Sequence, residues 1–383
     1  MNRFLLPTEV ISGPGCLVEL KRFVKAGDKV ALITDGPLVK LGLADIVVKV
    51  LEGIGATSEI FDEVPANPHA EVVNKCRAFV EGMGASVVVC LGGGSPMDVA
   101  KVVAMLATNE GEWEDYQWNM KQPTNPPLTY IAIPTTAGTG SEVTKTSVII
   151  DRNTKKGTGG DFFFAKAALL DPELMVSLPP ALTATTGVDA LTHAIEAYVG
   201  KNHQAFTDAL ALEAIAILAE YLPRAFANGT DLVAREKVAI AAAMAGLAMD
   251  QSGLGVVHAM SGPLSSYYDI PHGLSNAVGL PYGMAYNLIA VPERYARIAE
   301  ALGLDVSNLS FREAAEASVL MVEELLDDLQ IPTDLCDYFI KYGTDEADIL
   351  KFAEESCKMF LMRNNPRNPQ VKDIEEIFEA MLK

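Results

Sequence analysis

The most constraining feature of the sequence is an apolar strand that runs directly into a glycine turn and a helix. Residues 85–91 read ASVVVCL, which is typical of a buried strand, and three glycines follow at 92–94. Ser95 is a favourable N-cap and Pro96 a favourable first residue for a helix over 96–106. Free amides and the helix dipole at such a turn attract an anion, so we predict a phosphate site; an ordinary tight turn is the alternative.

Strand-like and helix-like segments alternate from the start of the chain to about residue 180. Strands are expected at 29–34, 58–64, 85–91, 128–133 and 167–171, helices at 69–83 and 96–106, and a hairpin at 143–151 with the following turn. After residue 180, alanine- and leucine-rich helical periodicity replaces the strand signals. We therefore predict an α/β domain with a mostly parallel sheet at 1–180, followed by an all-α domain at 181–383.

A second polar loop follows the next expected strand. Residues 134–142 read PTTAGTGSE and offer four hydroxyls and two glycines at the carboxyl end of a strand, where ligands of open α/β sheets bind. Two such loops on consecutive strands suggest a ligand with more than one polar group, such as a dinucleotide. Asp35, at the end of the strand 29–34, is placed to bind ribose hydroxyls and to favour NAD over NADP; a turn-forming aspartate is the alternative.

The helical half contains a candidate metal site. Asp189 and His193 are four residues apart in an apolar segment, so a helix places both on one face, one turn apart. This pair alone is more often an ion pair, but His258 and His272 lie in the same apolar region. One carboxylate and three imidazoles suit Fe²⁺, Zn²⁺, Ni²⁺ or Co²⁺.

Composition excludes several classes of partner. The net charge is −20, which argues against binding nucleic acid or an anionic membrane surface. The five cysteines have no CxxC spacing, so a disulfide framework is not expected and a cytoplasmic location fits. No signal-peptide pattern begins the chain, and the apolar run 238–249 is too short to span a bilayer, so we interpret it as a buried helix.

Taken together, these segments resemble the iron-containing (group III) alcohol dehydrogenase family. The matching segments are GGGSPMDVAK at 92–101, PTTAGTGSEVT at 134–144, GVDALTHAIEAYV at 187–199, GLGVVHAM at 253–260 and DIPHG at 269–273. The segments ITDGPL at 33–38, Asn67-Pro68 and Asn365-Pro-Arg367 also fit. The resemblance covers essentially the whole chain and implies the dehydroquinate synthase-like fold, with a dinucleotide-binding domain at 1–180 and a metal-binding and substrate domain at 181–383.

The resemblance also implies roles for individual residues. The four metal ligands would be Asp189, His193, His258 and His272. The residues that would bind the dinucleotide are Gly92, Gly93, Gly94, Ser95 and Asp98 in the first loop, Thr135, Thr136, Thr139 and Ser141 in the second, Asp35 and Asn67 at the adenosine end, and Lys156 near the nicotinamide ribose.

One position departs from the family pattern. Many members carry a second histidine four residues after the third metal ligand, where it helps to pass a proton or to shape the substrate pocket. This chain has Gly262 at that position. The departure calls the usual proton route into question and leaves room for a different substrate.

The resemblance implies an enzyme that transfers a hydride between NAD(H) and a small alcohol or aldehyde, with Fe²⁺ as the expected metal and Zn²⁺ or Ni²⁺ as alternatives. Homodimers or higher homo-oligomers are expected, and an edge strand near the N-terminus could pair between subunits. A reductase of a small anionic aldehyde (sulfonate, phosphonate or hydroxy acid) is the main alternative. A non-redox dehydroquinate synthase-like enzyme and a non-catalytic cofactor-binding sensor are less favoured. The first is disfavoured because residues 181–290 contain only four cations: Lys201, Arg224, Arg235 and Lys237.

Overall fold

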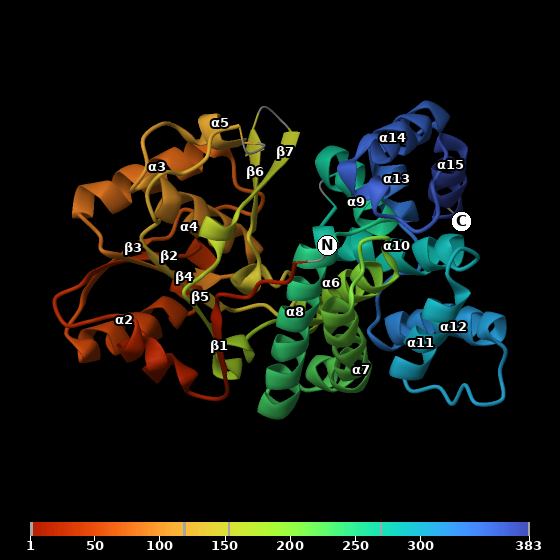
Figure 1. Ribbon diagram of the computed structural model, residues 1–383, viewed down its shortest axis with the longest axis horizontal. Helices are drawn as coiled ribbons and strands as arrows, with labels where there is room; N and C mark the ends of the chain where they lie inside the picture. The colour runs from red at the N-terminus through yellow and green to blue at the C-terminus, as the bar shows by residue number, and fades with distance from the viewer. Residues whose placement is uncertain (1–2, 118–119, 152–153, 269, 382–383) are drawn as a thin grey trace. The chain divides into compact units, whose positions relative to one another are not determined.

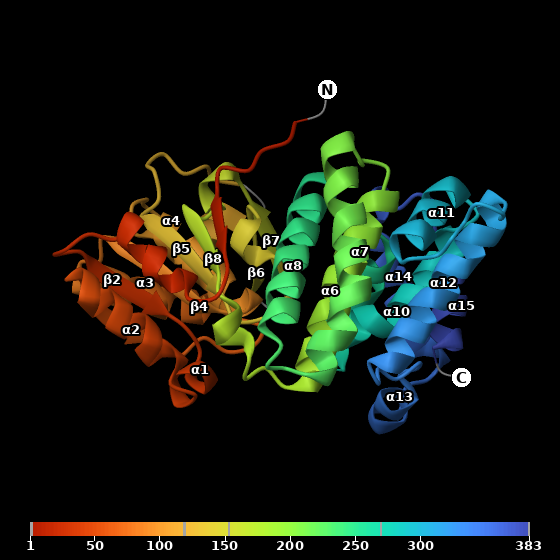
Figure 2. The same ribbon diagram turned by 90° about the horizontal axis from the view of Figure 1, so that it is seen from below.

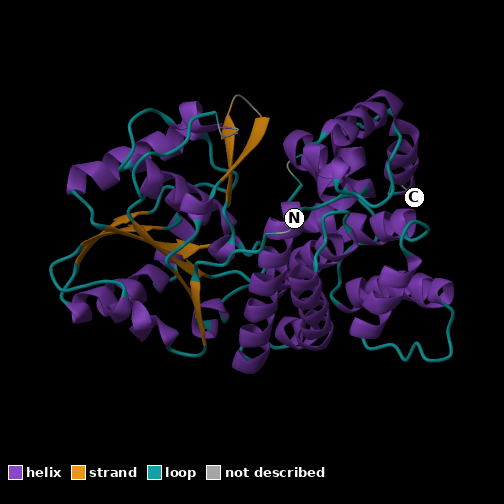
Figure 3. Cartoon of the chain, viewed as in Figure 1, coloured by secondary structure: helices purple, strands orange, loops and turns teal. Residues whose placement is uncertain are grey.

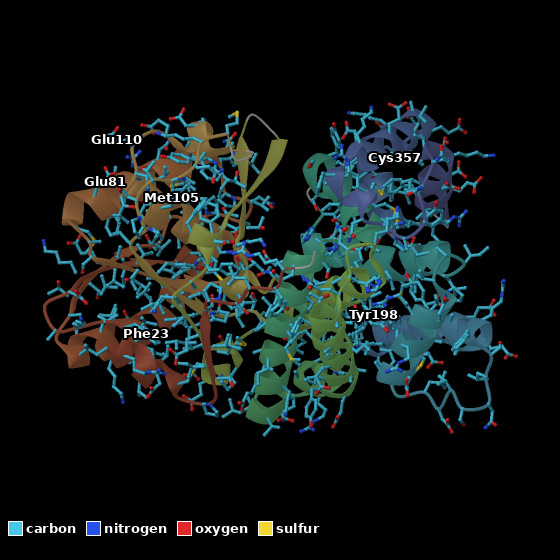
Figure 4. All side chains as sticks on the ribbon, in the orientation of Figure 1. Phe23, Glu81, Met105, Glu110, Tyr198 and Cys357 are labelled. Carbon is cyan, nitrogen blue, oxygen red and sulfur yellow. The ribbon has the colours of Figure 1, made fainter. Side chains whose placement is uncertain are left out.

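The computed structural model describes residues 3–117, 120–151, 154–268 and 270–381, and for residues 151 and 154–156 it describes the backbone alone. The chain divides into two compact units. An α/β unit comprises Leu5–Ser177, and a helical unit comprises Leu178–Lys383 together with Met1–Phe4. In Figure 4, Met105 marks the core of the α/β unit and Tyr198 that of the helical unit; both side chains are buried.

The α/β unit is built on one six-stranded parallel sheet with the order β1-β8-β5-β4-β2-β3 (Figure 1). The strands are β1 (Glu9–Ser12), β2 (Lys29–Ile33), β3 (Thr57–Phe61), β4 (Val87–Gly92), β5 (Thr129–Pro134) and β8 (Ala167–Leu170). The helices of this unit are η1 (Cys16–Arg22), α1 (Gly36–Lys40), α2 (Leu43–Ile54), α3 (Ala70–Met83), α4 (Gly94–Leu106), α5 (Trp113–Tyr116), η3 (Ser141–Val143), η4 (Asp161–Phe163) and η5 (Pro172–Met175). The predicted parallel sheet is confirmed.

Alternation along each strand divides the core into two layers, because successive side chains of a strand point to opposite faces. On one face, Val88 and Cys90 of β4 pack with α3 and α4. On the other, Val87, Val89 and Leu91 pack with α2 and η1. Both faces of β4 are thus covered, which explains why its sequence is apolar throughout rather than alternating.

The predicted hairpin is confirmed as β6 (Thr146–Asp151) and β7 (Thr154–Gly159), which pair antiparallel outside the main sheet. Figure 3 shows that the strands all belong to the α/β unit. Several boundaries differ from the prediction, since β3 ends at Phe61 rather than at residue 64 and the hairpin begins at Thr146 rather than at residue 143. Helix α4 begins at Gly94 with Gly93 as N-cap, not at Pro96 with Ser95 as N-cap, and no side chain caps it.

The helical unit contains α6 (Pro180–Val199), α7 (Ala205–Ala227), α8 (Leu232–Ser252), α9 (Val256–Tyr267), α10 (His272–Asn287), α11 (Pro292–Ala301), α12 (Phe311–Asp328), α13 (Cys336–Tyr342), α14 (Glu346–Lys358), η6 (Phe360–Arg363) and α15 (Val371–Ala380). Helices α6, α7 and α8 pack side by side (Figure 2). Gly187 permits the close approach of α6 to α7, since a Cβ there would lie 2.3 Å from Leu222 Cδ1. The run 238–249 lies within α8 and is mostly buried, as predicted, and no described helix is long and apolar enough to cross a membrane.

Candidate metal centre and cofactor loops

The candidate metal centre is assembled from three helices of the helical unit. Helix α6 carries Asp189 and His193, and the Nε2 atom of His193 lies 3.9 Å from Asp189 Oδ1. The same carboxylate oxygen is 3.7 Å from His258 Nε2 on α9 and 3.8 Å from His272 Nε2 at the start of α10. Three imidazoles therefore surround one carboxylate, as the sequence predicted.

The four predicted ligands are not equivalent. Asp189, His258 and His272 offer ligand atoms that all lie within 4.8 Å of one another. His193 contacts Asp189 and stacks on the ring of His258, with centroids 4.7 Å apart, but lies outside that mutual set. The side chains of Asp189, His193 and His258 are at most 5% exposed, whereas that of His272 is 43% exposed. Three of the four side chains are therefore buried, and His272 alone among them is exposed.

Two side chains that the sequence analysis missed turn these imidazoles toward the centre. Glu196, two helical turns after Asp189 on α6, contacts His258 Nδ1 through Oε2 at 2.6 Å, and its Oε1 accepts from Val257 N at 2.7 Å. Ser261 Oγ lies 3.3 Å from His272 Nδ1 and donates to the His258 carbonyl oxygen. With both Nδ1 atoms held in this way, the Nε2 atoms face Asp189, as metal-binding histidines require.

Asn276 marks the point on which these atoms converge. Its Nδ2 donates to Asp189 Oδ1 at 2.7 Å and lies 3.0 Å from His258 Nε2 and 3.1 Å from His272 Nε2. Acceptor atoms that gather around one hydrogen-bond donor are also a suitable set for a divalent cation, because each can offer it a lone pair. One oxygen and several imidazole nitrogens therefore fit Fe²⁺, Zn²⁺ or Ni²⁺. The sequence analysis also missed Asn276. Its spacing could have indicated it, because Asn276 lies four residues, or one helical turn, after His272.

The electrostatics agree with a cation site. Burial alone would raise the pKa of Asp189, but the neighbouring imidazoles, His193 foremost, hold it well below its usual range. Burial alone would lower the pKa of His258, but the neighbouring carboxylates of Asp189 and Glu196 raise it to about 9. The centre thus contains an ionised carboxylate and a histidine whose surroundings favour a bound positive charge. A metal ion can supply this charge in place of the proton, because both bind the same imidazole nitrogen.

Gly262 lies one turn after His258 on α9, and the space beside it is occupied. A Cβ at this position would lie 2.9 Å from Met359 Sδ. The Met359 thioether fills the space next to the Cα of Gly262, and the expectation that the glycine leaves room for a different substrate stays a prediction.

In the α/β unit, the glycine loop (92–95) connects β4 to α4. A Cβ on Gly92 would lie 2.7 Å from Pro96 Cγ, so this turn requires glycine. Because no side chain caps α4, the amides of Gly94 and Ser95 are directed outward from a helix of 13 residues. An uncapped helix N-terminus that follows a glycine turn is a common site for phosphate groups.

The hydroxyl loop (134–142) lies directly against the glycine loop, because β4 and β5 are neighbours and Gly92 pairs with Pro134. A Cβ on Gly93 would lie 3.2 Å from Thr136 Oγ1, and one on Gly94 would lie 3.0 Å from Thr139 Cγ2. The structure thus brings together two loops that the sequence analysis singled out separately. Thr135 and Ser141 are buried, whereas Thr136 and Thr139 are half-buried.

A buried lysine that the sequence analysis did not single out joins helix α4 to the hydroxyl loop and the residues that follow it. Lys101 of α4 is 1% exposed, and its Nζ donates to Ser141 Oγ at 2.8 Å, to Thr144 Oγ1 at 3.0 Å and to the Thr146 carbonyl at 2.8 Å. Asp98, one turn earlier, accepts from Ser141 Oγ through Oδ1 and from Val148 N through Oδ2. Both carboxylate oxygens of Asp98 therefore hold the hydroxyl loop and the strand β6 in place.

The remaining predicted cofactor residues are more scattered. Asp35 is half-buried and caps α1 by accepting from Leu38 N at 3.0 Å; burial raises its pKa. This capping role matches the turn-forming alternative, and the ribose contact stays a prediction. Asn67 is exposed and adopts a left-handed conformation with φ of 54°. The backbone of Lys156 pairs with Ile149, whereas its side chain lies outside the described part of the chain.

Comparison with known proteins places the whole chain in one family. Residues 7–172 match the profile described as "Iron-containing alcohol dehydrogenase", and residues 183–382 match "Fe-containing alcohol dehydrogenase family, C-terminal". The chain is 39% identical to the NAD-dependent methanol dehydrogenase of Bacillus methanolicus over 386 residues, which cover 100% of both proteins.

Solved structures agree with this assignment and with the predicted fold. A crystal structure of 1,3-propanediol oxidoreductase superposes with a TM-score of 0.94 at 38% identity and covers 100% of both chains. Sulfoacetaldehyde reductase from Bifidobacterium kashiwanohense, in complex with NAD⁺, superposes with a TM-score of 0.91 at 30% identity and covers 100% of this chain and 99% of that one. The chain therefore belongs to the iron-containing alcohol dehydrogenase family.

Proposed function

We propose that this protein transfers a hydride between NAD(H) and a small, neutral primary alcohol or aldehyde, using a divalent metal, Fe²⁺ in the first instance. The observation that carries the proposal is the convergence of three imidazole Nε2 atoms on Asp189 Oδ1 at 3.7 to 3.9 Å, with only His272 exposed among the four side chains. The family to which the chain belongs supports the same activity.

When bound, the metal acts as a Lewis acid on the substrate oxygen and the nicotinamide carries the hydride. Asp189, His193, His258 and His272 hold the metal in this proposal. Glu196 and Ser261 fix the orientation of two of these imidazoles through Nδ1. Asp189, His193 and His258 are buried, whereas the side chain of His272 is 43% exposed, and we propose that a substrate approaches along His272.

For the cofactor, the amides of Gly94 and Ser95 at the N-terminus of α4 bind the pyrophosphate, and Thr136 and Thr139 add hydroxyl contacts. This assignment is supported by the direct contact between the glycine loop and the hydroxyl loop. Asp35, Asn67 and Lys156 are proposed to contact the two ribose groups. Asp98 holds the hydroxyl loop through Ser141 and strand β6 through Val148, and its remaining lone pairs are proposed to contact the cofactor.

The scarcity of cationic side chains near the proposed metal ligands favours a neutral substrate. Helices α9 and α10 carry two of the proposed ligands, and the sequence has no lysine or arginine between Lys237 and Arg294. An anionic aldehyde would need a cation to replace the water that it loses in this site. Of the nearest cations before that gap, Arg235 is already engaged, since its guanidinium donates to Thr183 Oγ1 and the Leu178 carbonyl oxygen. Aldehyde reduction is the direction we propose for the cell.

At the level of the whole protein, residues 1–180 serve as the dinucleotide-binding domain and residues 181–383 as the metal-binding and substrate domain. We further propose a cytoplasmic homodimer or higher homo-oligomer. Strand β1 is an edge strand whose Val10 is 41% exposed, and edge strands can pair between subunits. Light scattering of the purified protein measures the oligomeric state, and a monomer at micromolar concentration would contradict this part of the proposal.

The test of the activity is NADH oxidation under anaerobic conditions with propanal, lactaldehyde, glycolaldehyde and sulfoacetaldehyde, using metal-free protein and protein loaded with Fe²⁺, Zn²⁺ or Ni²⁺. Metal-dependent turnover that is fastest with a neutral aldehyde is expected. Asp189→Asn should bind NADH normally but lose turnover and metal. Asp305→Asn, at an exposed loop position, is the matched control and should retain both.

The other outcomes separate the alternatives. Preference for sulfoacetaldehyde would replace the neutral substrate with an anionic one. Folded protein that binds NADH but turns over no aldehyde with any metal would contradict the proposal and favour a cofactor-binding sensor or a non-redox enzyme. Net alcohol oxidation at cellular ratios of NADH to NAD⁺ would overturn the proposed direction.

A further inference from the structure

The contact between Gly262 and Met359 carries an inference about the substrate. Residue 262 follows His258 by four positions in α9, so it lies on the helix face that carries this metal ligand, one turn away. Met359 Sδ would be 2.9 Å and Met359 Cε 3.2 Å from a Cβ at this position. The end of the methionine side chain thus rests on the bare backbone of Gly262, and no larger residue fits there without displacing it.

The position of Met359 is set by its backbone. It ends α14 with ψ of 138° and starts the turn into η6. Its N–H donates to the Ser356 carbonyl oxygen, and its own carbonyl oxygen accepts from Met362 N, both at 3.1 Å. Ser356 and Met362 are themselves buried. Met359 itself is only half-buried, so its side chain is partly exposed while its backbone is held on both sides.

A thioether has a distinct chemistry as the wall of such a site. It carries no charge, donates no hydrogen bond and accepts only weakly, but it is polarisable and packs well against alkyl groups. A second hydroxyl or a charged group of a substrate would lose its bonds to water against Met359 and gain none in return. An alkyl chain loses nothing there.

We propose that Met359, seated on Gly262, is a specificity-determining residue that selects alcohols and aldehydes with an unsubstituted alkyl chain over diols, hydroxyaldehydes and charged analogues. The inference rests on the proposed function, because it names the substrate class of the same site. Methionine at this point replaces the polar side chain that residue 262 could otherwise present beside His258.

The experiment compares substrates that differ only by a methyl group in place of a hydroxyl: 1-butanol with 1,3-propanediol, and 2-methyl-1-propanol with 1,2-propanediol. We measure kcat/KM with NAD⁺ for the metal-loaded wild type, Met359→Leu and Met359→Gln. The wild type should prefer the alkyl member of each pair by roughly 10- to 100-fold, the range by which a single hydroxyl changes selection in an apolar site. Met359→Leu should keep the preference, and Met359→Gln should reduce it at least about tenfold.

Met321→Gln is the matched control, since Met321 is also a half-buried methionine but lies on α12. It should leave the preference unchanged. Metal content and NADH affinity are measured for every variant, because a role in specificity leaves both intact. Should Met359→Gln not fold, Met359→Ala serves instead and should also lose the preference. An unchanged preference in a folded, metal-loaded Met359 variant other than Met359→Leu overturns the inference. No turnover of either alcohol or its aldehyde by the wild type contradicts the proposed function instead.

Discussion

Glu196 should control metal affinity without binding the metal. Its two carboxylate oxygens contact His258 Nδ1 at 2.6 Å and Val257 N at 2.7 Å, and both its side chain and that of His258 are at most 4% exposed. Glu196→Gln preserves the size of the side chain but cannot satisfy both contacts. If the amide oxygen faces His258, the amide NH₂ meets the N–H of Val257, and two donors oppose each other.

If the amide introduced by Glu196→Gln is turned the other way, its NH₂ faces His258 Nδ1, which must then accept. The imidazole proton moves to Nε2 and blocks the lone pair that a metal needs. Either arrangement weakens metal binding. Loss of such a supporting contact typically lowers metal affinity by about 10- to 100-fold, or about 1.4 to 2.8 kcal/mol.

The assay is competition for Zn²⁺ between the protein and a chromophoric chelator, for the wild type, Glu196→Gln and Glu213→Gln. Glu213, on α7, is exposed and serves as the control for loss of one carboxylate. Circular dichroism checks folding, and NADH affinity should not change, because the proposed cofactor loops lie in the other unit. Glu196→Gln that binds Zn²⁺ within about threefold of the wild type would refute the reasoning.

Three further predictions concern the α/β unit. Burial raises the pKa of Glu142 to about 7 from an ordinary 4.5, so its contribution to stability is complete below pH 4.5 and is lost as the pH rises through 7. The free energy of unfolding of Glu142→Gln minus that of the wild type should therefore rise by about 2 to 3 kcal/mol between pH 5 and pH 8. Thermal unfolding of both proteins at each pH measures it, and a difference that stays constant with pH would contradict the raised pKa. Lys101 Nζ lies 3.9 Å from Asp98 Oδ1, so Lys101→Met leaves this half-buried carboxylate and three acceptors without their cation and should cost roughly 3 kcal/mol of stability in urea unfolding, whereas an unchanged midpoint would show that the lysine is not needed. Gly92→Ala places a Cβ against Pro96 and should weaken NADH binding by roughly tenfold in a fluorescence titration, since such backbone strain costs about 1–3 kcal/mol; wild-type affinity would contradict the assignment of this loop.

The start of α4 shows how far local sequence rules extend. The apolar run and the glycines correctly predict a strand, a turn and a helix. The prediction of Ser95 as the N-cap was wrong. Gly93 adopts the extended conformation that an N-cap needs, so the helix begins at Gly94. Side-chain preference is one contribution to a helix start, and backbone freedom at glycine can outweigh it.

Asp98 shows a second limit. Its place in a glycine-loop motif predicts contact with the cofactor, which stays a prediction, but it does not predict that the Asp98 oxygens accept from Ser141 and Val148, 43 and 50 residues away in the chain. Nothing in the local pattern of residues 92–101 indicates which strand will pass beside the helix. Lys101 escaped notice for the same reason, because its acceptors come from the hydroxyl loop and the residues that follow it.

The sequence by itself determined the parallel sheet, the helical second half, the two polar loops and the i, i+4 pair of Asp189 and His193. These features depend on side-chain periodicity and on the conformational preferences of near neighbours, which a linear chain displays directly. Only the tertiary structure decided that Glu196 supports His258, 62 residues away, and that Met359 fills the space at Gly262. Such contacts arise from the packing of whole helices against one another, and that packing depends on the shapes of all the side chains between them.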